Sequence, residues 1–279
     1  MTSQIKTLLL LALLSGIVII IGGALGGQQG LVIAFAIALV MNVGSYWFSD
    51  TIVLRMYKAR ELAPDDAPLL HRIVGELAEN AGIPKPRVFV VQDESPNAFA
   101  TGRNPEHGVV AVTSGIMRLL TPEELRGVLA HEIAHIAHRD ILVQSVAAVL
   151  ASVITFLAHM AQFAAIFGGR DNREGGNPVA LIFMAILAPI AAALIQFAIS
   201  RSREYLADQG GAQYSGHPGD LASALGKLQN YSKQIPMRHG SESTAHMFIV
   251  NPFSGKSLAG LFSTHPPVEE RIRRLLAMR

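Results

Sequence analysis

The sequence predicts a mostly α-helical membrane protein, in which four transmembrane helices form two hairpins and an α+β domain lies in the cytoplasm. Half of the 279 residues are hydrophobic and only 16% are charged, which is too apolar for an ordinary soluble domain. The apolar residues gather in four long runs. Between the second and third runs, short strand-like and amphipathic segments predict a small β-sheet with helices.

Composition also excludes several kinds of site. The chain contains no cysteine, which rules out disulfides, a thiolate zinc site and cysteine nucleophilic catalysis. The formal net charge of +2 provides no large basic surface, so no nucleic-acid partner is expected. Membrane lipid is the expected surrounding of the apolar runs.

The first two apolar runs predict a transmembrane hairpin over residues 1–50. Residues 8–25 and 31–48 each approach the roughly 20 residues that a helix needs to cross a bilayer, and residues 26–30 form an uncharged turn. A cleaved signal peptide is the alternative for the first run, but the second run follows almost at once. Three basic residues come next, and the positive-inside rule places them in the cytoplasm. They are Arg55, Lys58 and Arg60.

Residues 51–140 form the first part of the predicted cytoplasmic domain. Apolar residues at helical spacing predict an amphipathic helix within 61–80, and β-branched runs predict strands at 87–92 and 108–115. The segment Asn97–Thr101 is a candidate edge strand of the same sheet.

Residues 141–199 contain the third and fourth apolar runs and predict a second hairpin. Its length favours a transmembrane pair, whereas its scattered polar residues also fit two long helices buried against the domain. Residues 200–279 complete the domain with three short helices and with a polar stretch, 237–263, expected to be a mobile loop.

The strongest chemical signal is HEIAH, residues 131–135. Positions i and i+4 of a helix share one face, so His131 and His135 can bind one metal ion, and Glu132 can reach a water on it. Thr121 and Glu124 form a capping-box pattern ten residues upstream, which predicts that this segment is helical. The bare motif also occurs in helices that bind nothing, but a capped helix and a downstream carboxylate favour a metal site of the zincin type.

A catalytic zinc keeps three protein ligands and leaves a position for water. His138 is too far for a shared ion, since it lies two turns from His131, roughly 10 Å along the helix axis. Glu204 is the preferred third ligand, although an ion pair with a neighbouring arginine would be the simpler role for it alone. Asp208 follows one turn later and can fix the tautomer of a ligand imidazole.

This arrangement predicts metal-assisted hydrolysis. Zinc would acidify a water molecule and polarise a carbonyl group, and Glu132 would act as the general base. The developing oxyanion needs further hydrogen-bond donors. The candidates are Asn97, Tyr205 and His265.

Several longer motifs extend this interpretation: SPNAFATG, TPEELRGVLAHEIAHIAHRD, SRSREYLAD and STHPPVEERI, together with the paired apolar runs. With them the chain resembles the HtpX-like membrane zinc metalloproteases, relatives of the CAAX prenyl proteases. The resemblance implies one Zn²⁺ per chain at His131, His135 and Glu204, with Glu132 catalytic and His265 near the site.

The resemblance has further implications for the biology of the chain. It implies a multi-pass protein of the bacterial inner membrane whose site faces the cytoplasm. It also implies a zinc metalloendopeptidase that clears misfolded or damaged membrane proteins during heat or envelope stress. Substrates would pair as extended strands with the Asn97–Thr101 segment, a mode that reads backbone more than sequence.

Three other functions are weaker fits. A non-catalytic scaffold would close its zinc site with a fourth ligand, such as His138 or His265. A transporter would normally place ionisable groups within its spans, and no acidic residue lies in a predicted span. A prenyl-peptide processing protease would need a large chamber, for which four spans are few. A homo-oligomer is compatible with the sequence.

Overall fold

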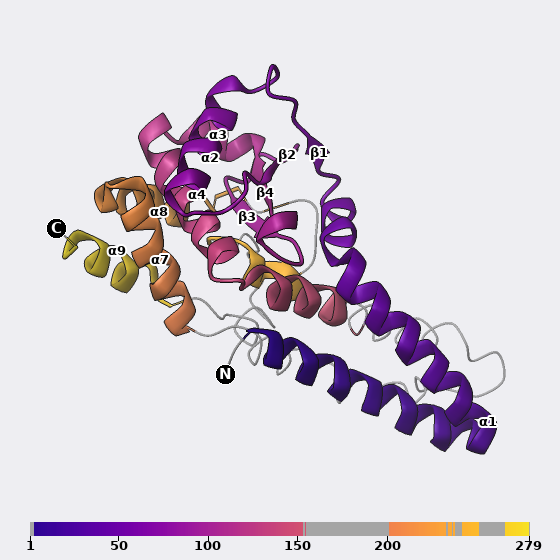
Figure 1. Ribbon diagram of the computed structural model, residues 1–279. Coiled ribbons are helices and arrows are strands. Elements are labelled where there is room, and N and C mark those ends of the chain that lie inside the picture. Colours follow the sequence, from indigo (N-terminus) through magenta and orange to yellow (C-terminus); the bar gives the residue numbers. More distant parts are fainter. Residues whose placement is uncertain are drawn as a thin grey trace, which may run out of the picture.

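The structure is a computed structural model that describes residues 3–152, 154, 201–232, 234–235, 237, 242–250 and 266–278. It is mostly helical, with a small mixed sheet, and an apolar N-terminal helix extends away from the α+β domain (Figure 1). Most of the predicted second hairpin and the candidate residue His265 lie outside the described residues.

The N-terminal helix α1 (Ser3–Met56) bends back on itself at Gly27 (Figure 1). Gly27 has φ 58° and ψ −139°, a conformation that a residue without Cβ adopts readily. The Asn42 side-chain amide donates a 2.8 Å hydrogen bond to Ser15 Oγ and joins the two arms. The bend therefore falls within the uncharged turn expected at residues 26–30.

In the described part of the chain, one unbroken helix is long and apolar enough to cross a membrane by length and composition. It is the second arm, Gly27–Met56, and the first arm contains a shorter apolar helix, Ile5–Ile20. The structure thus supports the apolar N-terminal part of the fold prediction, and the four transmembrane helices stay a prediction because most of the second hairpin lies outside the described residues.

The sheet contains four strands in the order β1-β2-β4-β3. Their bounds are β1 (Arg60–Glu61), β2 (Arg87–Val91), β3 (Ala98–Thr101) and β4 (Val109–Thr113). β2 and β4 are parallel, whereas β1 and β3 are antiparallel to their neighbours. β3 consequently lies at an edge of the sheet, as the sequence predicted. A 3₁₀ turn, η1 (Pro105–His107), and a short helix, α3 (Ser114–Leu119), flank β4.

Helix α4 (Pro122–Ala137) lies at the centre of the domain and carries the HEIAH motif. The predicted capping box is confirmed: Thr121 Oγ1 accepts from the Glu124 N–H, and the Glu124 carboxylate accepts from the Thr121 N–H. Helix α2 (Pro68–Asn80) buries one apolar face in the same core as α4. The sheet contributes residues such as Val88 and Val110 to that core.

Three later helices complete the domain around α4: α7 (Arg201–Ser215), α8 (Pro218–Ser232) and α9 (Val268–Leu276). α7 and α8 pack against α4, and α9 packs against α8 (Figure 1). The carboxylate of Glu124 links α4 to α8 by accepting from Ser223 Oγ and Lys227 Nζ, both at 2.7 Å.

The start of the predicted second hairpin fits the alternative of helices buried against the domain, and one other segment differs from its expectation. The helix Ile141–Ser152, at the start of the predicted second hairpin, bends by 91° from α4 and is almost wholly buried. The described part of the expected mobile loop contains η2 (Glu242–Met247) and is buried from Thr244 to Val250. That expectation was wrong for this part because its side chains, such as Phe248, pack into the aromatic and aliphatic core.

Candidate metal centre and active site

Three side chains from α4 and α7 converge on one point. The Nε2 atoms of His131 and His135 lie 3.2 Å apart, and the Glu204 carboxylate oxygens lie 3.8 and 3.6 Å from them. One ligand atom from each residue lies within 4.8 Å of the others. All three residues are at most 3% exposed.

A close approach of two helices produces this convergence. A Cβ added to Gly211 of α7 would lie 2.9 Å from the His131 backbone nitrogen and 3.0 Å from its Cα. Only glycine allows α7 to pack so closely on α4, and the carboxylate of Glu204, two turns earlier, is thereby brought to the two imidazoles. The sequence signal was the Gly210–Gly211 pair, which the sequence analysis did not use.

Each candidate ligand imidazole has a carboxylate at its other ring nitrogen. Asp208 Oδ1 lies 3.0 Å from His131 Nδ1, in the position predicted for it. Asp140 Oδ2 lies 3.6 Å from His135 Nδ1, an ion-pair distance that is too long for a hydrogen bond. Asp140 was missed, although its position five residues after His135 is a usable signal. Such carboxylates orient metal-bound imidazoles.

Arg271 of α9 is the second residue that the sequence analysis missed. It is fully buried, and its Nε and Nη2 atoms donate to both Asp208 oxygens at 2.9 and 2.7 Å. Its Nη1 atom donates to the Ile249 carbonyl at 3.1 Å and lies 3.9 Å from Glu204 Oε2. Arg271 thus connects α9 to the carboxylates of α7. A basic residue in a short charged helix gave no signal of this burial.

Burial and neighbouring charges shift the pKa values of the site. Burial and the nearby Arg271 lower the pKa of His131 to about 4. Burial opposes protonation of His135 too, but the Asp140 and Glu204 carboxylates outweigh it and raise its pKa to about 9. Burial raises the pKa of Glu132 to about 7, a value suited to proton transfer near neutrality.

The donor set fits a metal ion. Two imidazole Nε2 atoms that face each other at 3.2 Å, with a carboxylate beside them, form a His₂Glu arrangement. This set is typical of catalytic zinc, which leaves one coordination position for water. In the part of the chain that the structure describes, this is the cluster of three potential ligands that a single ion could join.

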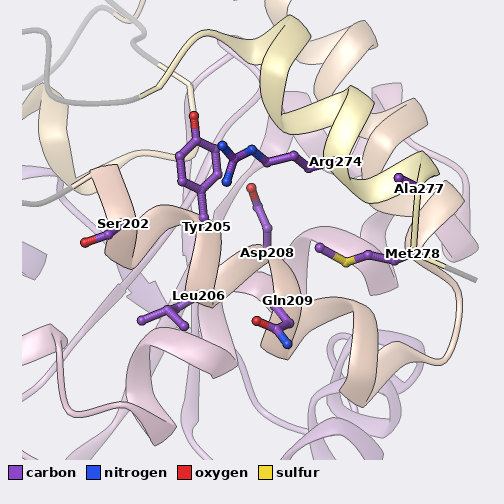
Figure 2. A pocket seen from close by; sticks show the side chains of 8 residues that line it. All are labelled: Ser202, Tyr205, Leu206, Asp208, Gln209, Arg274, Ala277 and Met278. Atoms are coloured by element: carbon purple, nitrogen blue, oxygen red, sulfur yellow. The ribbon is translucent and has the colours of Figure 1, made fainter.

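The structure describes three further residues predicted for the site. Glu132 is 2% exposed, and the nearby backbone N–H of Ala100 in β3 works against the effect of burial on its pKa. Asn97 is buried at the start of β3, where its amide donates to the Val250 carbonyl at 2.7 Å. The guanidinium carbon of Arg274 lies 3.8 Å from the centroid of the Tyr205 ring. Tyr205 also lines a cavity of about 570 Å³ between α7 and α9 (Figure 2).

Comparisons with known proteins show the family of the chain. Residues 64–279 match Peptidase family M48. The chain is 61% identical to a "Protease HtpX homolog" of Syntrophobacter fumaroxidans over the whole of both chains. It is 58% identical to a "Protease HtpX homolog" of Pyrococcus furiosus, over 97% of this chain and 94% of that relative.

A solved structure shares the fold. The crystal structure of S. mikatae Ste24p superposes with a TM-score of 0.51 at 18% sequence identity, covering 98% of this chain and 65% of that one. At this identity the likeness concerns the fold alone. The family match and the two relatives cover the metal cluster and its flanking helices, and the chain therefore belongs to Peptidase family M48, the metallopeptidases that include the HtpX proteases.

Proposed function

We propose that the chain is a membrane-bound zinc endopeptidase that hydrolyses peptide bonds of unfolded or damaged proteins. The observation that carries the proposal is the convergence of His131, His135 and Glu204, with Glu132 next to them on α4. Membership in a metallopeptidase family supports the reaction class.

In this proposal the three convergent residues hold one Zn²⁺ per chain. Bound zinc supplies an acidified water molecule and polarises the scissile carbonyl. Glu132, next to His131 on α4, accepts the proton of the attacking water and returns it to the leaving amine. Asp208 orients the His131 ring, and Arg271 holds Asp208 in place.

Substrate contacts are assigned to two further regions. Asn97 and the edge of β3 would bind the extended substrate backbone, because an extended peptide can add to the edge of a sheet. His265 would stabilise the developing oxyanion. This role rests on the STHPP motif, since His265 lies outside the described residues.

The proposed setting is the inner membrane of a bacterium, with a multi-pass topology and the site in the cytoplasm. α1 supports a membrane location because many of its large apolar side chains are exposed, Leu8 to 67% and Val40 to 71%. A protease beside the membrane with little sequence preference is suited to remove misfolded membrane proteins under heat or envelope stress.

Replacing Glu132 by glutamine tests the catalytic part. Glu132→Gln keeps the size of the side chain but removes the base, so zinc content should be unchanged while hydrolysis falls by roughly 100-fold or more. Zinc per chain is measured by elemental analysis, and activity by cleavage of casein. Glu123→Gln, an exposed residue of the same helix, is the matched control. Full activity in Glu132→Gln would contradict the proposal, and zinc without cleavage in the unaltered chain would favour a scaffold.

A further inference from the structure

The edge of β3 leads directly to the proposed general base. The Asn97 carbonyl accepts from Thr113 and therefore faces β4. Because backbone groups alternate in direction along a strand, the hydrogen-bonding groups of Ala98 and Ala100 point away from the sheet. β3 also packs against α4, the helix that contains Glu132. An extended peptide added to this edge would thus lie beside Glu132.

The chain already places one of its own segments at this edge. The segment Thr244–Val250, called the strap here, contacts the Ala98 carbonyl and the Asn97 side chain. The Ile249 N–H donates to the Ala98 carbonyl at 3.4 Å, and the Val250 carbonyl accepts from the Asn97 side chain at 2.7 Å. The strap therefore uses the backbone acceptor and the side-chain donor that are available to a substrate strand.

The strap also reaches the metal cluster. Arg271 Nη1 lies 3.1 Å from the Ile249 carbonyl oxygen and 3.9 Å from Glu204 Oε2. A single guanidinium nitrogen thus connects the strap backbone to a proposed zinc ligand. A peptide paired with the edge of β3 would need the same Ala98 carbonyl and Asn97 side chain that the strap contacts.

Three elements hold the strap in place. The Phe248 ring packs against Tyr57 and Phe99, with centroid distances of 5.1 and 5.3 Å. The Thr244 hydroxyl contacts the Tyr57 hydroxyl, and His246 Nε2 lies 3.2 Å from the Gln144 carbonyl oxygen. These anchors belong to the region after α1, to β3 and to the Ile141–Ser152 helix. They lie outside the metal cluster itself.

We propose that the strap is an intramolecular competitor of substrate, so that cleavage requires it to leave the edge of β3. The bond to the Ala98 carbonyl is long for an N–H···O hydrogen bond, whose usual range ends near 3.2 Å, so this contact is weak. The ligand side chains are at most 3% exposed, so a polypeptide reaches them only after a covering segment moves. This inference rests on the proposed peptidase function.

A reversible covalent lock tests the proposal, because the chain has no cysteine of its own. The Ile249 N–H and the Ala98 carbonyl lie within hydrogen-bonding distance, so the two backbones are adjacent, and a disulfide bridges Cα atoms about 4.4–6.8 Å apart. The double substitution Ala98→Cys with Ile249→Cys should form a disulfide that fixes the strap on β3. We expect the oxidised full-length protein to lose casein cleavage and a phosphine reductant to restore it, at unchanged zinc content.

The controls separate the two levels of the proposal. Each single cysteine variant should cleave equally under both redox conditions. If the oxidised and reduced double variants cleave equally, or if the pair does not oxidise, the strap proposal is overturned while the peptidase function stands. If the unaltered, zinc-loaded chain does not cleave, the peptidase function fails and the strap proposal fails with it.

Loosening the strap provides a second test. Tyr57→Phe removes one hydroxyl of the Tyr57–Thr244 contact but keeps the ring that packs on Phe248. We expect kcat/KM for casein to rise by about two- to tenfold, mainly through a lower KM, since a hydrogen bond contributes about 0.5–1.5 kcal/mol net. Tyr231→Phe, an exposed tyrosine of α8, is the control and should leave kcat/KM unchanged. A purely structural role of Tyr57 would leave kcat/KM unchanged or lower it, and either result overturns the proposal.

Discussion

Arg271 carries a permanent positive charge into the interior of the domain, where it is fully buried. Such a charge is tolerated only when it is paired and hydrogen-bonded, since moving an ion out of water costs several kcal/mol. Asp208 supplies the pairing by accepting two hydrogen bonds, and the Ile249 carbonyl accepts a third. The pair positions Asp208 behind His131, so it acts on the metal site through another residue.

Removing this charge should destabilise the protein. Arg271→Met leaves Asp208 buried without its partner, and we expect a loss of about 3–5 kcal/mol in the free energy of unfolding. The measurement is thermal unfolding in detergent. Arg273→Met is the matched control on the same helix, because its side chain is 76% exposed, and it should change stability by no more than about 0.5 kcal/mol. Equal midpoints for the two variants would contradict the role given to Arg271.

Glu204 should be needed for metal binding. Glu204→Ala removes one of three proposed ligands and the only negative charge among them, so zinc per chain should fall. Elemental analysis after dialysis against a weak chelator checks this, with the exposed Glu79→Ala as control. Zinc content equal to that of the unaltered chain would remove Glu204 from the ligand set.

Part of the site could be predicted from the sequence, because residues one helical turn apart lie on the same face of a helix. His131, Glu132 and His135 are defined by one helical turn, and Glu204 and Asp208 by a second turn on another helix. Arg271 could not be predicted, because its burial depends on a long-range partner. Asp140 is close to the motif in sequence, but its position behind His135 depends on how the chain turns after α4, where Arg139 adopts φ 58°.

At the scale of elements, the packing of α7 on α4 determines the geometry of the metal cluster. Gly211 makes this packing possible, since an added Cβ would meet the His131 backbone at 2.9 Å. Glu204 and Asp208 lie on the same helix as Gly211, so any outward shift of α7 moves both carboxylates away from the imidazoles. The glycine therefore affects the site without touching the side chain of a proposed metal ligand.

A single methyl group at this contact should weaken metal binding. Gly211→Ala forces α7 away from α4, and overpacking of this kind typically costs about 1–3 kcal/mol. We expect reduced zinc content together with a lower unfolding midpoint. Gly226→Ala in α8 is the control: the nearest atom to its added Cβ is Ile272 Cδ1 at 3.9 Å, so it should be neutral or stabilising by about 1 kcal/mol. Normal zinc content in Gly211→Ala would show that the close contact is not required.

Most helices and strands of the domain could be predicted from local sequence patterns. The elements that could not be predicted are too short or are buried by contacts with residues distant in sequence. Runs of β-branched residues predict the strands β2 and β4. The capping box predicts the start of helix α4. β1 has only two residues, too few to show any alternation. The strap has no helical or strand period, and its burial arises from contacts with Tyr57 and Phe99, which are distant in sequence.

At the scale of the whole molecule, α1 is suited to contact lipid because its second arm is long, apolar and mostly unburied. The second arm, Gly27–Met56, has 30 residues and a mean hydropathy of 2.0, with few buried side chains. At 1.5 Å per residue it is about 45 Å long, more than the roughly 30 Å of a bilayer's hydrocarbon core. Its C-terminal end leads into basic residues and then into the sheet, so the side of the membrane at this end determines where the active site lies.

The orientation of α1 should place its bend outside the cell and its C-terminal end in the cytoplasm. Since the chain has no cysteine, single cysteines introduced at exposed positions are unique labels. Gln28→Cys, beside the bend, should react with a membrane-impermeant maleimide in right-side-out vesicles, whereas Ala63→Cys, after β1, should react only after permeabilisation. Neither substitution removes a basic residue, so the charge asymmetry that sets the topology is preserved. The reverse labelling pattern would place the metal cluster outside the cytoplasm, and labelling of both sites from one side would show that the second arm does not span the bilayer.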